Sequence, residues 1–184
     1  MRLAFAALFA TTLFAQQSDI PTTIAESVGN MLRFTQGNLI GLAEAMPEGK
    51  YSFIPSAGEF KTSRSFGEQL KHVACANIAF FNQIEKKTPP QECEKGGPSK
   101  ASTKPELLKY LRDSFDYSNR VLLTVDSKSA LERVEGRYGG PDTQLGMAVT
   151  ALWHIADHYG QLVVYSRMNG IVPPATQKYP LNVR

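Results

Sequence analysis

The sequence predicts an all-α protein, a bundle of four helices. Apolar residues recur every three or four positions in four long stretches, and segments rich in proline, glycine and polar residues separate these stretches. No stretch of any length alternates apolar and polar residues as a half-buried strand would. The length of 184 residues and the apolar content of 42% suit one domain with a sizeable core.

The first two helices are expected from about Thr22 to Met46 and from about Ser65 to Lys87. The turn-forming segment "MPEGK" ends the first one. Ser65 and Glu68 have the spacing of a capping box at the start of the second, and Pro89-Pro90 stop it because proline cannot continue a helix.

The other two helices are expected from about Lys104 to Asp126 and from about Thr143 to Met168. Pro105 suits the first turn of the third helix, and Asn169-Gly170 followed by Pro173-Pro174 ends the fourth. The connection "TPPQECEKGGPSKASTK" between helices two and three has about 17 residues, which is long for a bundle. It therefore predicts a crossover rather than a tight hairpin at this point.

The N-terminus has the pattern of a secretory signal peptide. Arg2 precedes an apolar run from Leu3 to Ala15, and polar residues follow at once. We expect residues 1–15 to be removed and residues 16–184 to form the mature domain, in a periplasm or outside the cell. The run is too short to span a bilayer, which takes about 20 apolar residues, so no stable membrane insertion is expected. The alternative is a buried first helix.

Several function classes lack support. The formal net charge is only +3, and the basic residues form no patch, so binding to nucleic acid is not expected. The sequence contains no G-x-S-x-G, G-x-x-x-x-G-K or G-x-G-x-x-G motif, which argues against serine hydrolases, kinases and dinucleotide-binding enzymes.

The three histidines of the chain are candidate metal ligands. His154 and His158 stand four residues apart, on one face of the fourth helix, among apolar residues where unpaired imidazoles would be costly. His72 lies in the middle of the second helix, and a bundle can direct it towards that pair. Three imidazoles suit zinc, nickel, copper or iron, and leave positions open for water or substrate, as in catalytic sites.

Two glutamines and two cysteines stand near these histidines. Gln69, three residues before His72, and Gln161, three after His158, could orient an imidazole or face solvent. Cys75 and Cys93 could form one disulfide or remain two free thiols. Cys75 could instead place a thiolate near the metal, or be a small buried residue.

Charged and aromatic residues near these motifs also have two interpretations. Arg64 and Arg167 could bind an anionic substrate or form structural ion pairs. Trp153, Tyr159 and Phe80-Phe81 could surround a pocket, although aromatic residues at such spacings are more often part of a core. Asp157 and Tyr165 are weaker candidates for orienting an imidazole, and an aspartate such as Asp157 is more often a solvated charge.

Two segments, "SFGEQLKHVACAN" and "LWHIADHYGQLVVYSRMNGIVPP", resemble the DinB-like (YfiT-related) metalloproteins, with "YSFIPSAGEFKTSRS" as a looser match. The resemblance implies a four-helix bundle with up-down-down-up connectivity. It also implies a divalent metal, usually nickel or zinc, on His72, His154 and His158. Members with known chemistry include thiol S-transferases that act with bacillithiol or mycothiol and a mycothiol-dependent isomerase. A homodimer is compatible with the family type.

Together these observations lead to an exported divalent-metal protein. The first hypothesis is a metal-dependent enzyme, an S-transferase or other transferase or a hydrolase, that acts on a small substrate whose identity the sequence does not give. The alternative is a non-catalytic metal-binding or dimerising module. In a third interpretation the three histidines are structural and hold no metal.

Overall fold

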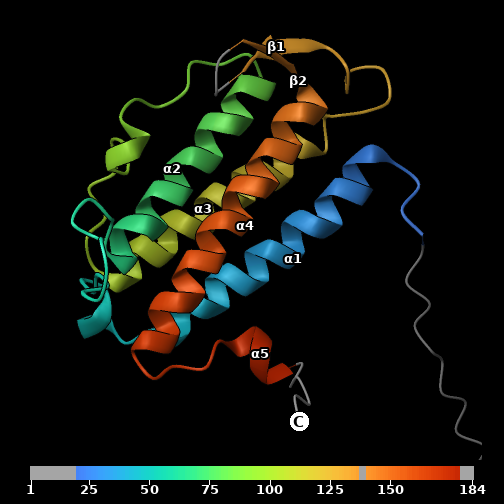
Figure 1. The fold of residues 1–184 in the computed structure, drawn as a ribbon. Helices are drawn as coiled ribbons and strands as arrows, with labels where there is room; N and C mark the ends of the chain where they lie inside the picture. The colour runs from blue at the N-terminus through green and yellow to red at the C-terminus, as the bar shows by residue number, and fades with distance from the viewer. Residues whose placement is uncertain (1–19, 137–139, 179–184) are drawn as a thin grey trace, which may run out of the picture.

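Four long helices make up the body of the protein in this computed structural model, which describes residues 20–136 and 140–178. The helices are α1 (Ile24–Ala45), α2 (Phe66–Ile84), α3 (Lys104–Leu122) and α4 (Gln144–Met168) (Figure 1). The prediction of an all-α bundle is confirmed. The expected signal peptide, residues 1–15, lies outside the described residues.

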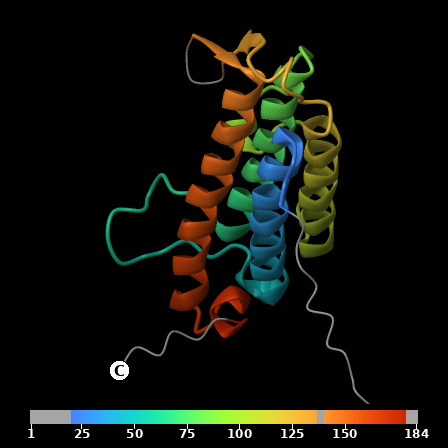
Figure 2. The same ribbon diagram turned by 90° about the vertical axis from the view of Figure 1, so that its right-hand side faces the viewer.

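The direction of each long helix can be followed from the colours of Figure 1. α1 runs down the picture, α2 and α3 both run up it, and α4 runs down again (Figure 1). The up-down-down-up connectivity is therefore present, and the long segment between α2 and α3 returns the chain to the end where α2 began. Figure 2, turned by a quarter, shows the same four directions.

The starts of the helices follow local hydrogen bonding. Ser65 accepts a bond from the amide of Glu68, and the Glu68 carboxylate accepts one from the amide of Ser65, so the expected capping box is formed. Thr23 and Glu26 form the same arrangement before α1. These caps fix where each helix begins, and in α2 they fix the position of every side chain that follows.

Two helices end earlier than the sequence predicts. α2 stops at Ile84 instead of Lys87, because Lys86 adopts a left-handed conformation with φ of 58°. α3 stops at Leu122 instead of Asp126. The amide of Thr124 bonds to the carbonyl of Val121, three residues back, so the chain has already tightened into turns.

Several short elements were not predicted. Strands β1 (Arg133–Glu135) and β2 (Pro141–Thr143) form an antiparallel pair with Val134 opposite Asp142. Three residues are too few to show a strand period in the sequence. A fifth helix, α5 (Pro174–Lys178), begins where we expected only the end signal of the fourth helix, since proline is favoured in the first turn of a helix.

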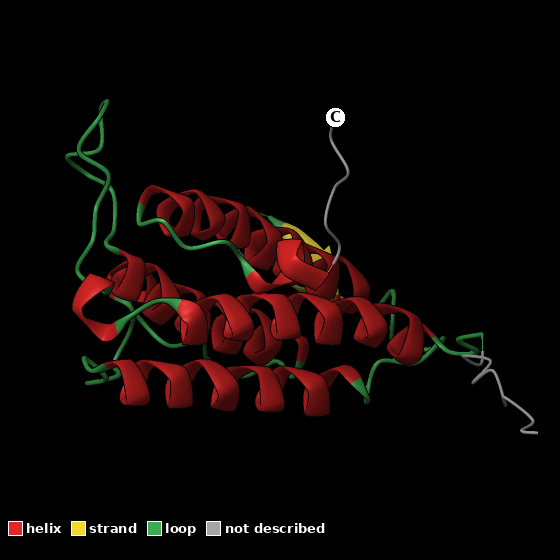
Figure 3. Ribbon diagram, turned by 90° about the horizontal axis from the view of Figure 1, so that it is seen from below, coloured by secondary structure: helices red, strands yellow, loops and turns green. Residues whose placement is uncertain are grey.

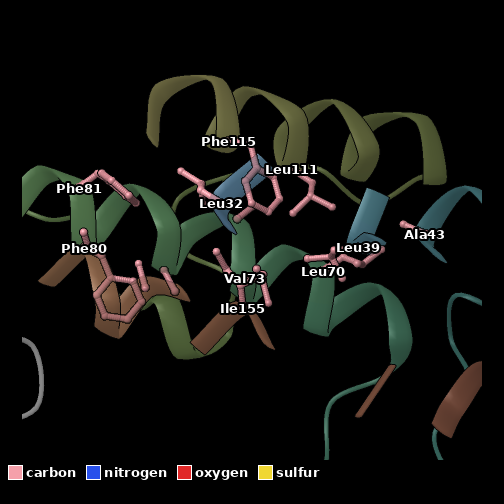
Figure 4. Packing of buried hydrophobic residues seen from close by; sticks show 14 of the residues in the cluster. Leu32, Leu39, Ala43, Leu70, Val73, Phe80, Phe81, Leu111, Phe115 and Ile155 are labelled. Atoms are coloured by element: carbon pink, nitrogen blue, oxygen red, sulfur yellow. The ribbon is translucent and has the colours of Figure 1, made fainter. Parts of the chain in front are cut away.

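The main core lies between all four long helices. Leu32 and Leu39 of α1 meet the α2 and α3 side chains at its centre, and Ile155 comes from α4 (Figure 4). All of these side chains are almost fully buried. Seen from below, the long helices lie side by side, and the loop between α1 and α2 projects away from them (Figure 3). Among the described residues, no helix has both the length and the apolar character to cross a membrane.

Candidate metal centre

The structure brings the three histidines together between α2 and α4. His154 and His158 lie one turn apart on α4, and His72 faces them from α2. All three are buried, and one ring nitrogen of each lies within 4.8 Å of the others. These are the only three residues in the described part of the chain that form a group of this kind from histidine, cysteine, aspartate or glutamate.

Two of the imidazoles are held in a defined orientation by oxygen acceptors. Nδ1 of His72 lies 2.8 Å from the backbone carbonyl of Cys93. Nδ1 of His158 lies 3.0 Å from Oε1 of Gln69. Because a carbonyl oxygen can only accept, each Nδ1 carries the proton, and in the neutral ring Nε2 carries the lone pair. Hydrogen bonds of this type orient histidine ligands in metal sites.

The ring nitrogens of the three histidines converge on one region. Nε2 of His72 lies 3.0 Å from Nε2 of His154, and the three rings pack at centroid distances of 4.5 to 5.0 Å, with His158 edge to face against both of the others. Three nitrogens bound to one tetrahedral ion at about 2.1 Å would be about 3.4 Å apart. The arrangement therefore fits a divalent ion with small movements of side chains.

The site keeps at least one ligand unprotonated at neutral pH. The pKa of His158 is lowered to about 4, first by burial and then by the neighbouring His72, while Asp157 acts in the opposite direction. A neutral imidazole is the form that binds a metal.

The histidines line the floor of a pocket of about 290 Å³. Its wall carries charged groups from three elements: Arg64 before α2, Glu94 in the 3₁₀ turn η2 (Cys93–Lys95), and Asp157 on α4. Arg64 forms an ion pair with Glu94 and also donates to its backbone carbonyl. Trp153, whose surface is 62% exposed, completes the rim.

The predicted neighbours of the site divide into two groups. Gln69 is buried and bonds to His158, whereas Gln161 is exposed and donates to Asp157, not to a histidine. Arg64 lines the pocket, but Arg167 bonds to Thr176 in α5.

Cys75 and Cys93 are joined by a disulfide between α2 and η2, with their Cα atoms 5.3 Å apart. Neither sulfur is therefore a thiolate ligand in this structure. The Cys93 carbonyl and the Glu94 carboxylate at this site were not predicted. A backbone acceptor leaves no sequence signal, and Glu94 lies in a loop whose path depends on tertiary contacts.

The aromatic candidates are also divided. Phe80 is buried and packs edge-on against His154 at a centroid distance of 5.3 Å, and Phe81 belongs to the main core. Tyr165 donates from its hydroxyl to the carbonyl of Arg64, which ties α4 to the residue just before α2. These aromatic residues form walls and supports, and only Trp153 reaches the pocket rim.

Comparison with known proteins identifies the family. The sequence pattern of the DinB superfamily matches residues 31–162, and the chain belongs to this superfamily. Comparison with curated protein sequences finds no match.

Three solved structures share the fold. A DinB-like protein from Bacillus cereus is 16% identical, with a TM-score of 0.68 over 83% of this chain and 96% of its own. A DinB-like protein from Bacillus subtilis (YjoA) is 19% identical, with a TM-score of 0.61 over 78% and 92%. A conserved protein from Enterococcus faecalis is 15% identical, with a TM-score of 0.65 over 80% and 98%. At these identities the similarity concerns the fold.

Proposed function

We propose that this chain is an exported metalloenzyme that binds a divalent ion, zinc or nickel, through His72, His154 and His158, and catalyses transfer to, or hydrolysis of, a small substrate. The observation that supports it most strongly is the pair of Nδ1 hydrogen bonds, from His72 to Cys93 and from His158 to Gln69, which leaves an Nε2 lone pair on each of these two rings within the converging three-histidine cluster. Histidines in a purely structural role have no need of this convergence.

When bound, a divalent ion lowers the pKa of a coordinated water or thiol and polarises a substrate oxygen. The residues of the chain have separate tasks. The three imidazoles leave room on the pocket side for an incoming ligand, because the pocket lies directly against them. Arg64 and Asp157 place opposite charges at the wall, where they can orient a polar substrate.

Metal content tests the first part of this proposal. We would measure it by elemental mass spectrometry on mature protein without a histidine tag, beside the His154→Ala/His158→Ala variant. The matched control is Gln161→Ala, one turn after His158 on the exposed side of the same helix. We expect about one ion per chain in the wild type and control and almost none in the double variant. Full metal content in the double variant would refute the site.

Turnover tests the second part. Metal-depleted protein and protein reloaded with zinc or nickel would be assayed with thiol and electrophile pairs and with ester and amide substrates. Turnover that requires the ion supports the enzyme. One bound ion without metal-dependent turnover across these classes would favour the non-catalytic binding module.

Export is tested by expressing the full chain and measuring the intact mass of the product in each cell fraction. We expect a periplasmic or secreted product that begins near residue 16. A cytoplasmic product that retains residues 1–15 would contradict this part of the proposal.

A further inference from the structure

The 3₁₀ turn η2 lies against the same side of α2 that carries His72, and one of its residues makes two connections to α2. The backbone carbonyl of Cys93 accepts the hydrogen bond from Nδ1 of His72. The side chain of Cys93 is bonded to Cys75, one turn after His72 on α2. The acceptor that orients the metal ligand is thus on the residue that the disulfide holds in place.

The other contacts between α2 and the segment around η2 are a small buried cluster and one close backbone approach. The cysteines and Ala79 form a small buried cluster separate from the main core, with only Tyr110 packed against it. Gly97 passes so near Cys75 that a Cβ atom there would lie 2.3 Å from its sulfur. The large apolar core, which holds the long helices together, therefore does not hold η2.

The remaining tie is electrostatic and exposed. Arg64 pairs with the Glu94 carboxylate and donates to the Glu94 backbone carbonyl, but both contacts are exposed, and exposed ion pairs of this kind contribute little. The disulfide, in contrast, joins Cys93 to α2 by a covalent bond. The covalent bond is therefore the main constraint on the position of the Cys93 carbonyl.

We infer that Cys75 and Cys93 are positioning residues for the metal centre: their disulfide fixes the carbonyl that holds the Nδ1 proton of His72, and through it directs Nε2 of His72 to the ion. This inference rests on the metal binding proposed above. If the disulfide acts in this way, its loss lowers metal affinity through His72 alone. A disulfide that only stabilised the fold would have no such dependence on one ligand.

A double-mutant cycle tests the coupling. Zinc affinity would be measured by competition with a chromophoric chelator for the wild type, Cys75→Ala/Cys93→Ala, His72→Ala and the combined triple variant. Alanine is chosen because a free thiol could itself bind zinc. Loss of an oriented partner typically lowers metal affinity about 10–100-fold. We expect at least about a tenfold loss on removing the disulfide from the wild type, and almost no further loss in the His72→Ala background.

Two results would overturn the inference: unchanged zinc affinity without the disulfide, or an equal loss in both backgrounds, which would indicate general destabilisation. Far-UV circular dichroism and thermal unfolding would accompany each variant as controls. If the wild type itself binds no zinc, the proposed metal site is wrong.

A second measurement needs neither a variant nor a metal. Long-range ¹H–¹⁵N spectra of the metal-free wild type report which nitrogen of His72 carries the proton. We expect the Nδ1–H form in the disulfide-bonded chain and a mixture of tautomers after reduction by a water-soluble phosphine, which takes up the oxygen of one water as two thiols form. An unchanged tautomer after complete reduction would overturn the inference even if the alanine variant failed to fold.

Discussion

Helix α2 buries polar side chains on the side that faces α3 and on the side that faces α4, and the two sets satisfy their hydrogen bonds differently. Towards α3, Asn77 donates to Ser114, and Ser114 and Ser118 donate to carbonyls of their own helix. Towards α4, His72 and its partners turn ring nitrogens towards one another.

Burial is common to both sets of polar side chains, so it is their hydrogen-bond partners that distinguish them. Buried polar groups must find partners because desolvation without a hydrogen bond is costly. On the α3 side the donors of Asn77, Ser114 and Ser118 find acceptors within the protein, and of these three side chains only the Oδ1 atom of Asn77 is buried without a hydrogen bond. On the α4 side the oxygen acceptors take up the Nδ1 positions and leave lone pairs facing a pocket. The first arrangement serves the fold, and the second could hold a metal ion.

The largest expected effect is a loss of stability from a substitution on the α3 side of α2. Phe115 is fully buried in the core between α2 and α3. Phe115→Ala should lower the free energy of unfolding by about 3–5 kcal/mol through lost burial and the cavity left behind. Urea unfolding measures this, with Phe115→Leu as a milder control. Zinc affinity of the folded variant should match the wild type, and a parallel loss of affinity would show that the two sides of α2 are coupled.

A smaller effect comes from pH on the α4 side. In the metal-free protein the pKa of His158 is lowered to about 4, whereas the ordinary value is 6.5. Below pH 6.5 the unfolded chain binds a proton that the folded chain excludes, so stability should fall as the pH is lowered towards 4. The loss from this group should be at most about 3 kcal/mol. Urea unfolding of the metal-free chain between pH 7 and pH 4 measures it, and His158→Gln should show a shallower dependence. Equal slopes for both would contradict the assignment.

A pair of matched variants separates the site from its surroundings. Gln69→Ala removes the acceptor of His158 and should weaken zinc binding about tenfold. Gln161→Ala removes an exposed glutamine that bonds to Asp157 and should leave zinc binding unchanged. Chelator competition measures both. Equal affinities for the two variants would mean that the Gln69 bond does not orient His158.

The smallest effect is expected at Ser118. Its hydroxyl donates to the carbonyl of Ser114. When the side chain is shortened to alanine, this carbonyl keeps its place in the hydrogen bonding of the helix backbone. Ser118→Ala should therefore change the free energy of unfolding by less than about 1 kcal/mol, since no buried donor is left unpaired. A loss above about 2 kcal/mol would show that the α3 side depends on its polar contacts more than the structure indicates.

The sequence predicted the features that depend on local pattern. The four helices follow from apolar spacing, and the Ser65–Glu68 cap follows from two residues three apart. The three histidines stood out because their types are rare in this chain and their helical positions suggest facing rings. In each case the signal lies within a few residues.

The missing features depend on contacts between distant segments. β1 and β2 pair across a turn, and neither is long enough to show a period. The Cys93 carbonyl acts as an acceptor only because the chain crosses back over α2, 21 residues after His72. Pro174 was expected to follow the end of the fourth helix, which it does, but its place at the start of α5 was not predicted. Predicting these features would require the path of the loops.

The position of Trp153 makes the pocket accessible to intrinsic fluorescence measurements. It is the only tryptophan in the sequence, and it lies half in solvent at the rim above the histidines. The long-wavelength fluorescence of the whole chain therefore comes from one ring at this rim. Any event in the pocket, such as entry of a quenching ion or a change of polarity, is reported by the native protein without a label.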